Sequence, residues 1–111
     1  MQISARTEHD VAVLELRGEL DGKTAPETQE AILQQAQPNC KMILDLSEMT
    51  YMSSAGLRVL LLVYRRVNAN NGRVALVGLS EEIRETMEMT GFLAHFQTYP
   101  TLRAGLEALV Q

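Results

Sequence analysis

Residues 42–46 are the feature that most constrains the fold of this chain. They read MILDL, an apolar run with a single acid, Asp45, near its end. A strand covered on one face alternates apolar and polar residues, whereas an unbroken apolar run is typical of a parallel strand covered on both faces. Parallel strands are joined by crossover connections, usually helices. The run therefore predicts an α/β fold around a central strand.

The flanking segments predict a hairpin before this strand and strand–helix units after it. Residues 3–6 and 11–17 are β-prone and separated by a polar turn, and the second segment alternates as a strand with one buried face does. We expect helices over residues 24–37, 57–70, 81–90 and 102–110, and further strands over residues 73–77 and 96–99. Such alternation favours parallel pairing, so the sheet should be mixed and layered with helices.

Two helix starts carry capping signals. Thr24 is followed three residues later by Glu27, with Pro26 in the first turn, which predicts a capping box. Ser80 precedes two acids, which suits an N-cap and the helix dipole. Both helices should therefore begin at a hydroxyl side chain.

The charge and cysteine content exclude several classes of protein. The 111 residues suit one domain, residues 1–111, and ten Lys and Arg against fourteen Asp and Glu give a net charge of −4, so a strongly basic nucleic-acid binder is excluded. Cys40 is the single cysteine, and His9 and His95 are too far apart for a metal-binding spacing. The sequence shows no signal peptide and no membrane-spanning run. We expect a cytoplasmic protein without metal or cofactor, a monomer or weak dimer.

Residues 18–24, GELDGKT, stand where a phosphate-binding loop would stand, between a strand and a helix. Three residues separate the two glycines, whereas the motif requires four, and Glu19 and Asp21 would repel a phosphate. The simpler interpretation is a turn that leaves the strand and caps the helix. We therefore expect no hydrolysis of ATP or GTP.

Residues 52–56, MSSAG, place serines on a strand-to-helix turn. A hydrolase nucleophile elbow reads G-x-S-x-G; with Ser54 as nucleophile, Gly56 fits, but Met52 occupies the place of the first glycine. His95 is the candidate base, and nothing in the sequence places it near Ser54. An acyl-transfer enzyme is therefore the weaker alternative, and we expect no catalytic residues.

The same turn is well suited to modification. Ligands of open α/β sheets gather where strands end and helices begin, and Ser54, at or near the N-cap, would face free backbone N–H groups. A phosphoryl group there would be stabilised by the helix and would add about −1.5 to −2 charges. A plain N-capping serine is the structural alternative.

Met49 and Met52 flank the turn as core residues or, alternatively, as an exposed contact. Residues 65–66, both arginine, fit a solvated helix face, with a partner contact as the alternative.

Residues 42–58, MILDLSEMTYMSSAGLR, resemble the signature of STAS domains, in particular the bacterial anti-sigma factor antagonists. Residues 18–21 resemble the family's G-x-[LI]-D motif, and residues 72–78 and 90–92 resemble its later landmarks. The resemblance covers essentially the whole chain. It implies the STAS fold, an α/β arrangement with a mixed sheet of four or five strands and about four helices.

The resemblance also implies a regulatory role without catalysis. The family's antagonists bind a serine kinase that doubles as an anti-sigma factor, lose binding when the kinase phosphorylates them, and are restored by a metal-dependent serine phosphatase. By motif position the phosphorylated residue is Ser54. Asp21, Ser53, Ala55, Gly56 and Arg58 would then form the supporting phosphosite and partner surface.

Two positions depart from the well-studied members, and other roles remain open. Ser53 stands where those members have Asp, and Ala55 where they have Ser or Thr, so Ser53 is a second candidate acceptor. The alternative function is a stand-alone accessory module of an anion or lipid transport system, which would require a membrane partner. A small enzyme lacks a base, a metal set and a phosphate loop.

Overall fold

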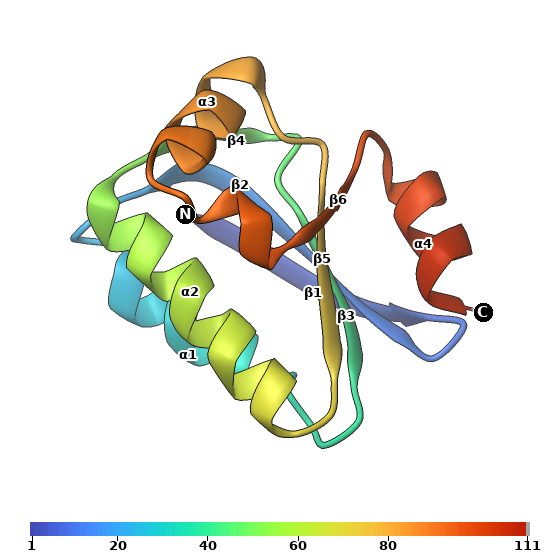
Figure 1. Cartoon of the computed structure of the whole chain (residues 1–111). Helices are drawn as coiled ribbons and strands as arrows, with labels where there is room; N and C mark the ends of the chain where they lie inside the picture. The colour runs from blue at the N-terminus through green and yellow to red at the C-terminus, as the bar shows by residue number, and fades with distance from the viewer. Residues whose placement is uncertain (111) are drawn as a thin grey trace.

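The chain alternates strands and helices along most of its length. The structure is a computed structural model that describes residues 1–110 (Figure 1). Its elements, in order, are β1 (Gln2–Glu8), β2 (Val11–Leu20), α1 (Ala25–Leu33), β3 (Lys41–Asp45), β4 (Met49–Met52), α2 (Ser54–Ala69), β5 (Arg73–Val77), α3 (Glu81–Met89), the 3₁₀ turn η1 (Leu93–His95), β6 (Gln97–Tyr99) and α4 (Leu102–Val110).

The sheet is mixed, as the sequence predicts. Strands lie in the order β1-β2-β3-β5-β6, with β1 and β2 antiparallel and the later neighbours parallel. The run that reads MILDL supplies β3, which pairs with β2 on one side and β5 on the other. The predicted α/β arrangement, a mixed sheet with four α-helices, is thus confirmed for the described residues.

Helices cover both faces of the sheet. The larger core cluster joins one face to α1, α2 and α3, with Ile32, Leu60 and Met87 fully buried. The smaller cluster lies on the other face, beneath α4 (Figure 1). The predicted single buried face of residues 11–17 is therefore wrong: Val11 and Val13 are also fully buried, because α4 covers the side of β2 that alternation would leave to solvent.

One strand is absent from the sequence prediction. The expected turn at residues 51–56 begins later, because Met49–Met52 forms β4, which pairs in parallel with the far end of β2. The register of that pairing shifts between Gly18 and Glu19, a β-bulge at which Gly18 has φ +107°. β2 therefore extends to Leu20. Because Leu20 pairs with Met52 at the end of β4, α2 starts directly beside the end of β2.

Helix bounds also differ in detail. α1 ends at Leu33, not before Pro38, because the backbone N–H groups of Gln35 and Ala36 bond three residues back and tighten the chain into turns. α2 begins at Ser54, earlier than the expected residue 57. That earlier start makes Ser53 the N-cap of α2 and Ser54 its first helical residue.

Candidate functional site

Two segments that are distant in sequence meet at the start of α2. The register pairs Leu20 at the end of β2 with Met52 at the end of β4, and the backbone N–H of Ser53 donates to the Leu20 carbonyl at 2.9 Å. The loop after β2, residues 21–24, therefore lies beside the β4–α2 junction, residues 52–56. Asp21, which follows Leu20, and the serine motif, which follows Met52, are thus brought into one neighbourhood.

Ser53 is the N-cap of α2. Its backbone is extended, with φ −90° and ψ 179°, and its hydroxyl accepts the backbone N–H of Gly56 at 3.4 Å. One of the unpaired N–H groups of the first helical turn is satisfied in this way. The sequence placed Ser54 at or near the N-cap. In the structure Ser53 is the N-cap and Ser54 is the residue after it.

Ser54 is the first helical residue and is exposed. Among the described residues its hydroxyl makes no hydrogen bond. The first turn of α2 contains no acid, so the positive end of the helix dipole is not compensated there, in contrast to α3, which begins with Glu81 and Glu82. A free hydroxyl in this field is well placed to accept an anionic group.

Gly56 allows α2 to approach the end of β2. A Cβ atom at this position would lie 2.8 Å from Leu20 Cγ, 2.9 Å from the Leu20 carbonyl oxygen and 2.9 Å from Met52 Cγ. Gly56 is buried, and its neighbour Ala55 is half-buried. The glycine therefore fixes how closely the serine motif lies against the β2 loop.

Asp21 organises that loop from within. Its Oδ1 accepts the backbone N–H groups of Lys23 at 2.9 Å and Thr24 at 3.1 Å. Hydrogen bonds from these N–H groups, Thr24 first, lower the pKa of the Asp21 carboxyl below its usual value. The carboxylate therefore shapes the loop beside the serine motif.

The predicted capping box at Thr24 is wrong. The Thr24 hydroxyl makes no cap bond to α1; it accepts the backbone N–H of Asp21 at 3.0 Å and donates to the Glu19 carbonyl at 2.9 Å. The hydroxyl is occupied by the chain entering the loop and is not free for the helix it precedes. Ser80, by contrast, caps α3 as predicted, accepting the Ile83 N–H at 3.2 Å.

Arg58 and the methionines complete the surroundings of the motif. Arg58 is exposed and lies four residues after Ser54, hence on the same face of α2. Met49 and Met52 are buried, so neither is an exposed contact. Tyr51, which the sequence reasoning did not single out, is 52% exposed at the edge of the motif; a lone aromatic residue in a short strand carries no signal that distinguishes exposure from burial.

The geometry does not support the two enzymatic alternatives. Gly18 and Glu19 lie within β2, so no phosphate-binding loop forms around them. His95 packs against Tyr64 with ring centroids 5.3 Å apart, and Tyr64 is ten residues beyond Ser54, about 15 Å along the helix. His95 therefore cannot serve as a base for Ser54.

Residues 1–110 contain neither a metal-binding cluster nor a membrane-spanning helix. No group of three or more His, Cys, Asp or Glu side chains is arranged to hold a metal ion. Nor does any helix in that range combine the length and apolarity needed to cross a membrane.

Comparisons with known proteins agree with the resemblance. The model of the STAS domain family matches residues 2–105. A protein of Bordetella bronchiseptica, named as a candidate anti-sigma factor antagonist, is 43% identical over 56 residues, 50% of this chain and 48% of its own length. The anti-sigma-B factor antagonist of Listeria monocytogenes is 33% identical over 75 residues, 67% of this chain and 66% of its own length. The matched stretches thus span about half to two thirds of these relatives.

The fold has solved counterparts across its whole length. The crystal structure of an anti-sigma factor antagonist from Mycobacterium paratuberculosis superposes with a TM-score of 0.89 at 27% identity, covering 99% of this chain and 94% of its own. Anti-sigma factor antagonists of this kind are regulatory binding proteins and not enzymes. The chain belongs to the STAS domain family.

Proposed function

We propose that this chain is the antagonist of a partner-switching system. Its unmodified form binds a serine kinase that acts as an anti-sigma factor, and the binding frees the sigma factor. The kinase ends the interaction by phosphorylating Ser54, and a metal-dependent serine phosphatase restores it. The proposal places the chain in the cytoplasm, where sigma factors act.

The observation that carries the proposal is that one of the two adjacent serine hydroxyls is hydrogen-bonded and the other is free. The Ser53 hydroxyl is engaged with the N–H of Gly56, whereas Ser54 is exposed and its hydroxyl is free among the described residues. A kinase needs an accessible hydroxyl whose modification does not dismantle the fold. Ser54 meets both conditions.

The phosphoryl transfer is chemically simple at this position. The Ser54 Oγ forms the new bond to the γ-phosphorus of ATP, the bond to the ADP oxygen breaks, and the hydroxyl proton is lost. The product dianion lies at the uncompensated positive end of α2, which stabilises it. The fold should therefore tolerate the modification.

The same charge is unfavourable once a partner covers it. A phosphoryl group adds about −1.5 to −2 charges to a surface that the partner meets as a neutral turn. Burying that charge without a matching cation costs desolvation and repulsion. Asp21, Ser53, Ala55 and Gly56 would then hold the loop and helix start in the shape that the partner reads, and Arg58 would lie at the edge of the contact.

Phosphate incorporation tests the proposal directly. Candidate serine kinases of the anti-sigma type from the same genome are purified and incubated with ATP and with the wild-type, Ser53→Ala and Ser54→Ala proteins. We expect incorporation into the wild type and Ser53→Ala, mapped to Ser54 by mass spectrometry, and none into Ser54→Ala. Incorporation that survives Ser54→Ala and disappears in Ser53→Ala would place the acceptor one residue earlier; no binding and no incorporation by any such kinase would refute the function.

A further inference from the structure

The exposed face of α2 is an arginine face that continues from the phosphorylation site. α2 contains three of the chain's ten basic residues and none of its fourteen acids. At 3.6 residues per turn, Ser54, Arg58, Leu62 and Arg65 fall on one side of the helix, with Arg66 beside them. All five are exposed. We use "arginine face" for these four later residues, Arg58, Leu62, Arg65 and Arg66.

The charges of this face are not used within the fold. Each of the three ion pairs formed within residues 1–110 involves another arginine, namely Arg6, Arg17 or Arg103. In a chain of net charge −4, carboxylates are abundant, yet no carboxylate within residues 1–110 lies within ion-pair distance of the arginine face. The face is therefore available to an external partner.

Helix stability does not explain the position of Arg58. A cation near the positive end of a helix dipole is unfavourable, and acids are preferred there. α1 and α3 follow that preference, with Glu27 and with Glu81 and Glu82 in their first turns. α2 instead has no acid in its first turn and has Arg58 immediately after it. The helix dipole thus gives Arg58 no stabilising role, which leaves its side chain available to a partner outside the helix.

Leu62 adds an apolar contact between the charges. Its side chain is 38% exposed. Leu60, Val63 and Val67 form part of the buried side of α2. Leu62 lies on the opposite, exposed side, between Arg58 and the pair Arg65 and Arg66. Leu62 therefore adds apolar contact area between the charged side chains, and arginine is itself enriched at protein interfaces.

We propose that the arginine face is the docking surface for an acidic patch of the anti-sigma factor kinase. This inference rests on the proposed function and adds the chemistry of the partner. The unmodified face attracts carboxylates on the kinase. A phosphoryl group on Ser54, one helical turn from Arg58, offsets the positive potential of the face and repels the same carboxylates. The same arginine charges thus attract the kinase before phosphorylation and are offset by the phosphoryl group after it.

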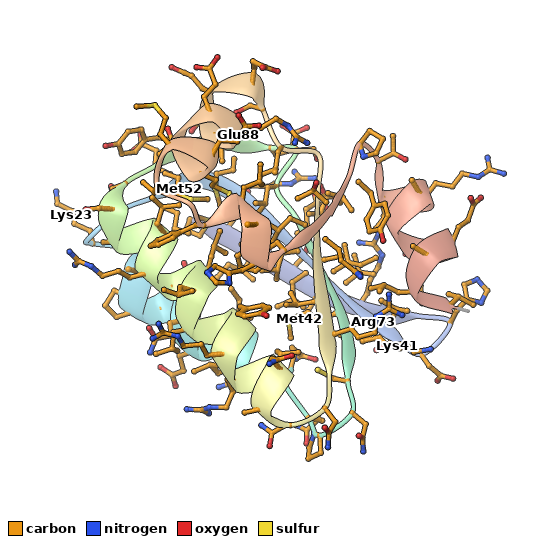
Figure 2. The ribbon with its side chains drawn as sticks, viewed as in Figure 1. Lys23, Lys41, Met42, Met52, Arg73 and Glu88 are labelled. Carbon is orange, nitrogen blue, oxygen red and sulfur yellow. The ribbon has the colours of Figure 1, made fainter. Side chains whose placement is uncertain are left out.

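Charge-neutralising variants test the surface. The double variant Arg58→Gln/Arg65→Gln removes two charges and keeps good helix formers on an exposed face. The matched control is Lys41→Gln/Arg73→Gln, which removes the same charge from paired strand ends that lie far from Lys23 and the start of α2 (Figure 2). The affinity of the purified kinase is measured for all three proteins at low and high salt, with the thermal midpoint of each as a check on folding.

We expect the kinase Kd to rise about tenfold for Arg58→Gln/Arg65→Gln, with a weaker salt dependence, and to change less than about twofold for the control. Equal losses in both variants would show a net-charge effect and overturn the inference. An unchanged Kd for Arg58→Gln/Arg65→Gln, with the wild type bound, would overturn the inference alone and leave the proposed function standing. Binding of duplex DNA or phosphatidylserine vesicles that is lost only in that variant, with kinase affinity intact, would assign the face to another polyanion. A kinase that does not bind the wild type would overturn both proposals.

Discussion

At the scale of single residues, the two adjacent serines at the start of α2 have separate tasks. Ser53 satisfies a backbone N–H that the first turn of the helix leaves unpaired, and Ser54 presents a free hydroxyl to solvent. A serine at this position forms the capping hydrogen bond without adding a charge to the helix start.

Replacing the two serines separates these tasks. Ser53→Ala should lower the free energy of unfolding by about 0.5–1 kcal/mol, the lower part of the range for lost N-caps, because the accepted bond is long at 3.4 Å. Ser54→Ala should change it by less than about 0.5 kcal/mol. Urea denaturation of both variants measures the difference. A larger loss for Ser54→Ala than for Ser53→Ala would mean that the cap is assigned to the wrong serine.

Asp21 should make the stability of the loop depend on acid. Its pKa is lowered in the folded chain by the N–H groups of Thr24 and Lys23, so the ionised form is favoured by folding. That contribution is fully present above the ordinary value of 3.8 and is lost as the pH falls through the lower folded pKa. Asp21→Asn should therefore have a lower thermal midpoint than the wild type at about pH 7, and the gap between the two midpoints should narrow as the pH falls below 3.8. A gap that stays the same as the pH falls through this acid range would contradict this role.

The residue-scale features were only partly predictable from the sequence. Ser80 is a cap in both the prediction and the structure, since nothing competes for its hydroxyl. Thr24 has the same local signal, but its hydroxyl bonds to Glu19 and Asp21, because a long β2 brings the incoming chain against it. A local motif cannot report such a competitor. The exposure of Tyr51 and Leu62 likewise depends on how whole elements pack.

At the scale of elements, the site depends on the short strand β4. It extends the pairing of β2 past a bulge and so carries the start of α2 to the end of that strand. Four residues are too few for a periodic pattern, so the sequence indicated a turn there. The long apolar run of β3 and the strongly amphipathic α2 were predictable because burial dictates their composition along the whole element.

Gly56 tests the contact between α2 and β2. Alanine favours helices over glycine, so Gly56→Ala would stabilise an isolated helix. In the chain, however, the new Cβ would meet the Leu20 carbonyl oxygen at 2.9 Å, and a backbone atom cannot move aside cheaply. We expect a loss of about 1–3 kcal/mol in the free energy of unfolding. Gly22→Ala is the control, because a Cβ there meets nothing within 4 Å; equal stabilities for the two variants would show that the close approach is not required.

At the scale of the whole molecule, the sheet is covered on both faces and the serine motif lies at one of its ends. α1, α2 and α3 enclose the larger core, and α4 closes the smaller one (Figure 1). The sequence predicted the α/β layers and the strand-to-helix position of the serine motif. It did not predict the second buried face of β2. The alternation within that strand carries no information about α4, which packs on its other side. Ser54 lies outside both cores, so a change there can alter binding without altering packing.

The central claim is that phosphorylation of Ser54 acts on the interface and not on the fold. The direct measurement compares the wild type with protein that carries phosphoserine at position 54, by thermal midpoint and by the affinity of the purified kinase. The account predicts a midpoint that is unchanged or higher, since the start of α2 stabilises the dianion, together with a loss of at least about tenfold in affinity. Unchanged affinity, or a lower midpoint large enough to account for the lost binding, would contradict it.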